Sequence, residues 1–320
     1  MPLPITEPNV QPPVAGRSLR QRGLAALLLL LPAVAAIWLL HSPAAPVFSG
    51  LSSWIGLANA DVRAGESLRL GDYQVAIEAQ VIAGLASDVS GLTYDPDRRT
   101  LFAITNKRPE IVELSLQGDV LRRIPVAGLD DPEAIEYIGP GHYVVADERT
   151  QTLVEIRIDE ATQQIDTAAS RKFSIGMGRN GNRGFEGLAY DRQGDRLFVA
   201  KERNPLRIYE VTGFPTLAGE GARPLEIADN PQRDAALPVR DLSSLYYDAG
   251  SGNLLVLSDE SQVVLEVDRQ GRRLARLALK KGRHGLQRSV PQAEGMAMDE
   301  AGNLYLVSEP NLFYLFRRDE

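Results

Sequence analysis

One short pattern recurs five times between residues 90 and 309, and it constrains the fold more than any other feature of the chain. Each copy opens with an acidic or hydroxyl residue and a small residue, runs as a short apolar strand, turns over a polar segment and returns as a second apolar strand. The openings read SGLTYD from Ser90, EAIEYI from Glu133, EGLAYD from Glu186, SSLYYD from Ser243 and EGMAMD from Glu294. Counted at the second residue, the copies are 43, 53, 57 and 51 residues apart. A period of this length is typical of one propeller blade.

Apolar residues cover both faces of these strands, as in LFVAKE from Leu197, which is expected of a sheet packed between two neighbours. A third strand follows each pair, and a fourth follows in every copy except the last. The strand YQVAIEAQVI, from Tyr73, precedes the first copy and is free to supply the missing one. The sequence therefore predicts an all-β fold: a five-bladed β-propeller of four-stranded antiparallel blades, with the N-terminal strand closing the last blade. Six blades would need a repeat that is not visible.

The acidic residues of the repeat are expected to gather at one end of the channel. In a propeller blade the first strand starts, and the second strand ends, on the same face of the ring. The first-strand starts are Ser90, Glu133, Glu186, Ser243 and Glu294, and the second-strand ends are Asn106, Glu148, Glu202, Glu260 and Glu309. Carboxylates that converge in a low dielectric repel one another and need compensation.

Two kinds of compensation fit this pattern. One is a bound Ca2+ ion, which takes six to eight oxygen ligands and tolerates irregular geometry, whereas magnesium does not. Its predicted ligands are Glu133, Glu186 and Glu294 at the strand starts, followed by Glu148, Glu202 and Glu309 at the strand ends. The other is a network of salt bridges with the basic residues at the same columns, which are Lys107, Arg108, Arg149, Lys201 and Arg203.

Composition excludes several classes of function. The formal charge is −7, which argues against a nucleic-acid partner, because phosphate binding depends on Lys and Arg. The chain has no cysteine, which excludes disulfides and thiolate metal sites, and only three histidines, which makes a multi-histidine metal site improbable. The run from Gly176 to Gly181 fits G-x-G-x-x-G, but a strand follows it instead of a helix, so we interpret it as a loop between blades.

The N-terminal part predicts a membrane anchor. Residues 24–40 hold no charged residue and follow Arg17, Arg20 and Arg22, so residues 1–23 are expected in the cytoplasm and everything after residue 40 in the periplasm. The alternative is a signal peptide cleaved after Ala58-Asn59-Ala60, which lies far beyond the apolar run. Residues 41–66 are rich in Ser, Ala, Gly and Pro and read as a linker to the propeller at 67–320. The basic run from Lys280 to Arg288 is read as a solvated loop or as a contact with anionic headgroups.

The chain also resembles a known family. The stretches DPEAIEYIG, GFEGLAYD, QAEGMAMD and GNLYLVSEPNLFY, over residues 70–318, resemble the SdiA-regulated proteins. The resemblance implies a membrane-anchored five-bladed propeller, distantly similar to NHL-repeat proteins, with a bound calcium ion. Ser90 and Ser243 stand in place of the acid in two units, which would move a cation toward the second, third and fifth blades.

Two classes of function remain open at this point. The first is a calcium-stabilised binding or scaffold module that presents a propeller face to a protein or small ligand. The second is a calcium-dependent hydrolase of lactonase-like or phytase-like type, in which the ion polarises an oxygen of the substrate and a carboxylate activates water. No histidine of the sequence is placed to shuttle protons at the acidic face, which favours the binding module.

Overall fold

A computed structural model describes residues 67–85, 88–175, 184–215 and 224–318. The chain divides into two compact units, Met1–Asn59 and Ala60–Glu320, and every described residue belongs to the second. The predicted anchor at residues 24–40 and linker at 41–66 therefore lie outside the described residues. Within the described part, no helix has the length and apolar character needed to cross a bilayer.

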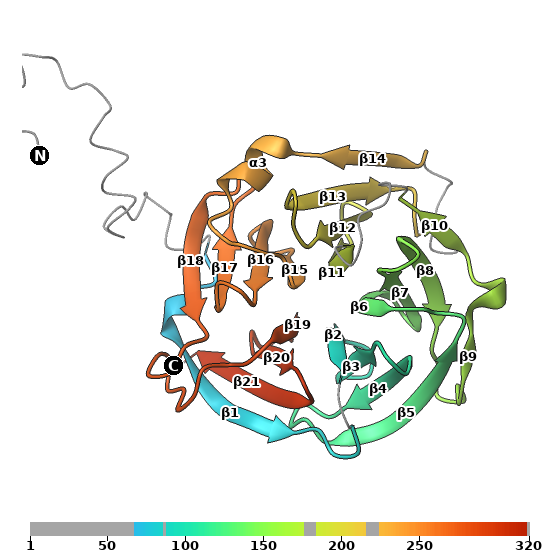
Figure 1. The fold of residues 1–320 in the computed structure, drawn as a ribbon, viewed down its shortest axis with the longest axis horizontal. Helices are drawn as coiled ribbons and strands as arrows, with labels where there is room; N and C mark the ends of the chain where they lie inside the picture. Colours follow the sequence, from blue (N-terminus) through green and yellow to red (C-terminus); the bar gives the residue numbers. More distant parts are fainter. Residues whose placement is uncertain (1–66, 86–87, 176–183, 216–223, 319–320) are drawn as a thin grey trace, which may run out of the picture. The chain divides into compact units, whose positions relative to one another are not determined.

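The described residues form five sheets around a common axis, so the predicted five-bladed propeller is confirmed (Figure 1). The first blade adds a two-stranded parallel extension, and the other four sheets have four strands each. From the axis outward, the strands are β2 (Val89–Asp95), β3 (Thr100–Thr105), β4 (Glu110–Leu114) and β5 (Val120–Ala127) in the first blade; β6 (Pro132–Gly139), β7 (His142–Asp147), β8 (Thr152–Arg157) and β10 (Lys172–Ser174) in the second; β11 (Phe185–Asp191), β12 (Arg196–Lys201), β13 (Arg207–Thr212) and β14 (Glu226–Asp229) in the third; β15 (Ser244–Asp248), β16 (Asn253–Ser258), β17 (Val263–Val267) and β18 (Arg273–Ala278) in the fourth; β19 (Ala293–Met298), β20 (Leu304–Ser308), β21 (Leu312–Arg318) and β1 (Tyr73–Val81) in the fifth.

The first strand of the described chain closes the ring, as predicted. β1 pairs antiparallel with β21, from Tyr73 opposite Arg318 to Val81 opposite Leu312. This pairing covers the edge that β21 would otherwise expose, and it joins the two ends of the described chain in one blade. Because the ring is complete without any residue before Ser67, residues 67–320 contain every strand of the five blades.

The hydrophobic core lies between the blades and leaves the axis free. Five clusters of buried side chains fill the five spaces between neighbouring blades. The space between the first and second blades, for example, holds Phe102 and Tyr143, whose rings meet edge to face with centroids 5.1 Å apart. Both faces of each middle strand are thereby buried, which explains the continuous apolar runs of the sequence.

The small residue of each repeat is explained by how closely the inner strands approach one another. A Cβ added to Gly187 would lie 2.9 Å from the Cα of Ser244 in the next blade, and one added to Gly91 would lie 2.9 Å from the Cα of Ala134. At Gly295 the nearest neighbouring backbone atom, the Leu92 nitrogen, would be 2.7 Å away. Only a small residue allows five strands to converge at this radius.

Three features were not predicted. Residues Ile165–Asp166 form β9, which leaves the second blade and pairs in parallel with β5 of the first. A 3-10 helix, η3 (Thr167–Ala169), follows it, and the fourth strand of that blade, β10, has three residues. A one-and-a-half-turn helix, α3 (Pro231–Ala236), connects the third and fourth blades, with the Asn230 side chain accepting a hydrogen bond from Arg233 N.

Candidate metal centre

The acidic residue that opens the repeat lies on a β-bulge in three blades. In β6, β11 and β19 the strand pairing skips one residue, which is Glu133, Glu186 and Glu294 respectively, and in β2 it skips Ser90. A bulged residue is left out of the ladder, and the bulge redirects its side chain. The repeat therefore places one side chain per blade at the same end of the channel, and in three blades that side chain is a glutamate.

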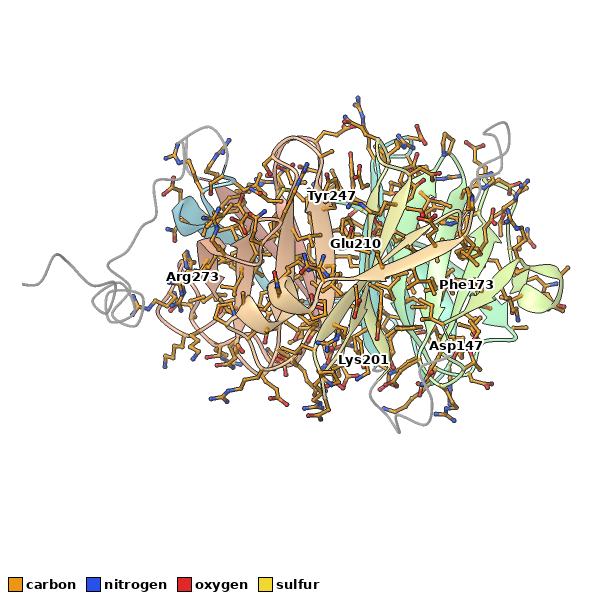
Figure 2. The ribbon with its side chains drawn as sticks, turned by 90° about the horizontal axis from the view of Figure 1, so that it is seen from above. Asp147, Phe173, Lys201, Glu210, Tyr247 and Arg273 are labelled. Atoms are coloured by element: carbon orange, nitrogen blue, oxygen red, sulfur yellow. The ribbon has the colours of Figure 1, made fainter. Side chains whose placement is uncertain are left out.

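The second-strand ends are held beside these bulges by backbone hydrogen bonds. Glu148 N donates to the Asp131 carbonyl at 2.8 Å, Glu202 N to that of Gly184 at 3.1 Å, and Glu309 N to that of Gln292 at 2.9 Å. Seen edge-on, the strand-two residues Asp147 and Lys201 lie at one face of the ring and Tyr247, from a first strand, lies toward the other (Figure 2). The starts of first strands and the ends of second strands share one face, which we call the mouth.

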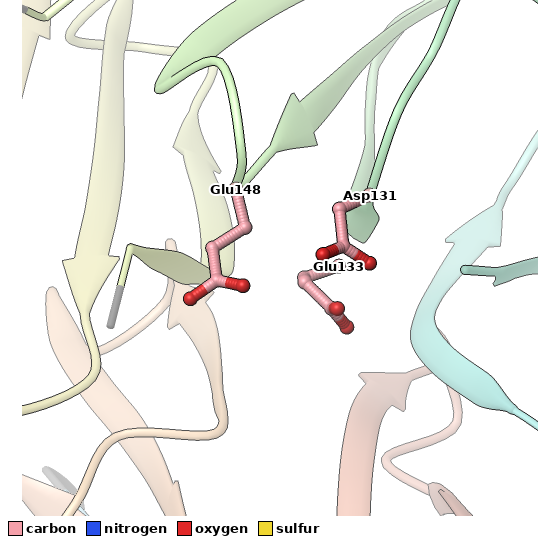
Figure 3. Close-up of side chains that lie close together, drawn as sticks. All are labelled: Asp131, Glu133 and Glu148. Atoms are coloured by element: carbon pink, nitrogen blue, oxygen red, sulfur yellow. The ribbon is translucent and has the colours of Figure 1, made fainter. Parts of the chain in front are cut away.

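The predicted residues come together there. A cavity of about 280 Å3 at the mouth is lined by five of the six predicted ligands, which are Glu133, Glu186, Glu202, Glu294 and Glu309. The sixth, Glu148, lies directly beside Glu133. Carboxylate oxygens of Asp131, Glu133 and Glu148 all lie within 4.8 Å of one another, and Figure 3 shows the three side chains converging. This separation allows one cation to contact all three groups.

Crowding and burial oppose ionisation of the mouth carboxylates. Burial raises the pKa of Glu133 to about 8, with Asp131 and Glu148 adding to the effect and hydrogen bonds from Asn106 and Ser90 opposing it. Burial likewise raises the pKa of Glu294 to about 8, with a contribution from Asp259. The pKa of Glu186 is raised well above its ordinary value by burial and then by the surrounding glutamates. The pKa values of four further groups are raised, with burial as the largest cause: Glu148, Glu202, Asp259 and Glu309.

Salt bridges account for only the outer part of the mouth. Arg149 pairs with Asp131 at 2.9 Å, Arg203 pairs with Glu202 at 2.6 Å and also with Glu260, and Lys107 pairs with Asp88. Lys201 is turned away and donates to backbone carbonyls, including that of Arg203. Among the described residues, the strand-start glutamates have no basic partner in an ion pair. The salt-bridge alternative therefore leaves Glu133, Glu186 and Glu294 without a compensating charge.

Sequence reasoning missed the acidic residues that stand two positions before the strand starts. Asp131 belongs to the triad, and Asp241, buried at 3% exposure, accepts hydrogen bonds from Ser258 Oγ and from Glu260 N at 3.2 Å. This column reads Asp88, Asp131, Gly184, Asp241 and Gln292 through the five repeats. Its acidic character is visible in three of the five copies, and that signal was available in the sequence.

Neither described histidine outside the masked residues belongs to the mouth. His142 begins β7 and lies 3.5 Å from Glu155, whereas the mouth lies at the other end of that strand. His284 lies on the outer rim, with Nδ1 2.9 Å from the Tyr73 carbonyl oxygen. In the described part of the chain, the mouth thus offers oxygen donors and carboxyl groups but no imidazole.

The fold and the site together define a class: a five-bladed β-propeller with a carboxylate-lined mouth on its axis. Comparison with known families is specific. The model of the SdiA-regulated family matches residues 65–317, and the chain belongs to that family. The resemblance noted from the sequence is thereby confirmed.

Solved structures resemble the chain only distantly. A structure described as a nidogen/laminin complex shares 16% identity, with 74% of this chain and 85% of that chain covered and a TM-score of 0.47. A streptogramin B lyase shares 11% identity, with 77% and 98% covered and a TM-score of 0.46. A virginiamycin B lyase from Staphylococcus aureus shares 12% identity, with 74% and 68% covered and a TM-score of 0.41.

Proposed function

We propose that this protein is a calcium-binding propeller, anchored in the inner membrane by residues 24–40 and facing the periplasm, that serves as a binding or scaffold module. The observation that carries the calcium proposal is the convergence of the strand-start glutamates at one mouth without basic partners. Family membership and the propeller fold support the broader description as a binding module.

The donors at the mouth fit calcium better than other common ions. Asp131, Glu133 and Glu148 are all oxygen donors, and together they carry enough carboxylate oxygens for most of a calcium coordination sphere. Asn106, whose Nδ2 donates to Glu133 at 3.1 Å, holds that carboxylate in place. Zinc and copper favour imidazole or thiolate, and the chain has no cysteine and no mouth histidine among the described residues. A bound Ca2+ would supply positive charge to the inner mouth.

The same geometry supports a ligand-binding role for the face around the mouth. The mouth cavity opens on the face where the blade-connecting segments end, and Arg203 and Gln292 line it beside the glutamates. A calcium ion held on one side by carboxylates would leave the cavity side for an anionic or carbonyl group of a ligand. Hydrolysis is the alternative activity, and no specific contact at the mouth favours it.

Calcium binding is tested by metal analysis and by thermal unfolding of residues 67–320. We expect the purified fragment to retain calcium, and we expect its melting temperature to rise with added Ca2+ but not with Mg2+ after chelation. Glu133→Gln removes one charged ligand of the triad, so it should abolish most of this rise. Glu226→Gln is the matched control, because Glu226 is exposed on the outer strand β14.

The two variants make the outcome decisive. A calcium response that Glu133→Gln leaves unchanged would reject the assigned ligands, and a response lost equally in Glu226→Gln would indicate a general loss of stability. A location of the ion by anomalous scattering in a crystal of the same fragment would then identify the remaining ligands.

A further inference from the structure

The outer surface of the fourth and fifth blades carries a concentration of positive charge. Residues 269–293 contain eight Lys or Arg and no Asp or Glu, in a chain whose formal charge is −7. Seven of these cations follow one another along β18 and the loop after it, and all seven are exposed. We call this surface the basic rim, and it comprises Arg272, Arg273, Arg276, Lys280, Lys281, Arg283 and Arg288.

The loop that presents these cations is fixed to the fifth blade. Val75 N, in β1, donates to the His284 carbonyl at 2.9 Å, and the Glu78 carboxylate accepts from the backbone nitrogens of Gln287 and Arg288, both at 2.9 Å. Leu286 of the same loop is buried in the core between the fourth and fifth blades. A loop held in this way displays its charges in a defined arrangement, unlike a solvated excursion.

Few of these charges take part in the structure of the propeller. Within the described residues, only Arg272 of the basic rim forms an ion pair, with Asp268 at 2.6 Å. Glu78, the acidic group nearest the loop, is engaged by backbone nitrogens. Arginines of other blades are paired more closely, as in Arg122 with Glu113 and Arg233 with Glu210, both at 2.6 Å. The charge of the basic rim is therefore available to a partner.

The chain enters the propeller at this same surface. Ser67 Oγ and Leu68 N donate to Glu266 of β17 at 2.6 and 3.0 Å, and the 3-10 helix η2 (Leu70–Asp72) that follows packs against β18. Figure 1 shows β18 and the start of β1 side by side on the outside of the ring. The uncharged run at 24–40 is separated from Ser67 by 26 residues. A flexible linker of that length spans roughly 28 Å on average.

We propose that the basic rim docks on the anionic headgroups of the membrane that residues 24–40 enter, so that the fourth and fifth blades lie against the bilayer. This inference rests on the proposed anchoring, because the linker keeps the rim near the surface and makes a weak attraction effective. Each Lys or Arg close to an anionic leaflet strengthens the association about fivefold. A long nucleic acid fits less well, because the remainder of the chain carries a net negative charge.

The test uses residues 67–320, which contain all five blades and lack the proposed anchor. Sedimentation is measured with vesicles of phosphatidylcholine alone and with vesicles in which one third of the lipid is phosphatidylglycerol. We expect binding to the anionic vesicles only, and we expect it to weaken as salt is raised. Changing Lys280, Lys281, Arg283 and Arg288 together to Gln should weaken binding by more than about tenfold, given about fivefold per cation.

A control with the same change in net charge separates a defined surface from a general charge effect. Arg99, Arg108, Arg157 and Lys172, which are exposed on the first and second blades, are changed together to Gln, and this variant should bind as the unchanged fragment does. Both variants should melt at similar temperatures, because the loop is held through backbone groups and Glu78. Absence of binding to anionic vesicles, or equal loss in the two variants, would overturn the proposal. Equally tight binding of double-stranded DNA, lost in the same rim variant, would assign the surface to nucleic acid instead.

The outcome is independent of the proposed anchoring and calcium site. If residues 24–40 do not span a membrane, the vesicle experiment still reports whether the rim binds headgroups. Repeating it with chelator and with calcium shows whether the ion at the mouth contributes. Binding that appears only with calcium would place the lipid contact at the mouth and would contradict the basic rim.

Discussion

The carboxylates of the mouth differ in how their charge is handled. Asp131 and Glu202, toward the outside, have arginine partners, whereas Glu133, Glu186 and Glu294 have none among the described residues. For these three, burial is the first cause of the raised pKa and neighbouring carboxylates the second. Protonation is the means by which the calcium-free protein tolerates such a cluster at neutral pH. Calcium therefore has to displace protons when it binds.

This displacement predicts the pH dependence of stability. A carboxyl group whose pKa rises on folding, as in Glu133 and Glu294 at about 8, binds more protons in the folded than in the unfolded state. Its stabilising contribution is present below the unfolded pKa and is lost as the pH rises toward the folded pKa. In chelator, the free energy of unfolding should fall between pH 5 and 8, by about 1.4 kcal/mol per pH unit for each proton involved.

The measurement is denaturant unfolding of residues 67–320 across this pH range, with chelator and with calcium. Calcium favours the ionised groups, so the decline should be smaller or absent when the ion is present. A parallel titration in weak buffer should detect proton release on calcium binding near pH 7. A profile that is the same with and without calcium would contradict the assignment of these glutamates to the ion.

The repeat element couples a small residue to an acid through one local device. The bulge that turns Glu186 out of the ladder is followed at once by Gly187, which lies against the backbone of the next blade. Removing the side chain at one position allows the inner strands to converge, and convergence is what gathers the acids. In the fourth blade, Ser243 precedes β15 without a bulge, and the acid comes from Asp241 instead.

The close approach predicts the effect of one added methyl group. Gly187→Ala would place a Cβ 2.9 Å from Ser244 Cα and 3.0 Å from Leu245 N, both of which are backbone atoms that cannot rotate away. We expect a loss of about 1–3 kcal/mol in the free energy of unfolding, measured with urea. Gly71→Ala is the control, because no atom lies within 4 Å of its added Cβ. Equal stability of the two variants would show that the inner strands can separate without cost.

How much the sequence revealed can be judged from the same elements. Five blades, ring closure by β1 and the gathering of the six glutamates followed from periodicity and from the direction of the strands. β9 was not predicted because residues 158–171 carry no strand pattern, and its partner β5 belongs to another blade. Helix α3 is too short for a helical period, although Asn230 and Pro231 are a typical helix start. The bulges themselves leave no mark on composition, so Asp131 was overlooked.

On the scale of the whole molecule, ring closure puts both ends of the described chain in one place. Tyr73 pairs with Arg318, so the segment before β1 and the residues after β21 leave the propeller at the top of the fifth blade, beside the basic rim. The acidic mouth and the basic rim are therefore separate surfaces with separate partners. An anchored propeller docked through its rim would keep the mouth open to ligands from the periplasm.

This arrangement makes topology measurable from the C-terminus. Arg17, Arg20 and Arg22 precede the uncharged residues 24–40, and basic residues favour the cytoplasmic side of an apolar segment. A reporter fused after Glu320 that is active only outside the cytoplasm, such as alkaline phosphatase, should therefore be active in cells. A fusion protein active only in the cytoplasm should be inactive at the same position. Replacing the three arginines with glutamate should reduce the first activity, because it removes the signal that orients the segment. Activity of the cytoplasmic reporter in the unchanged chain would overturn the proposed orientation and, with it, the periplasmic setting of the mouth.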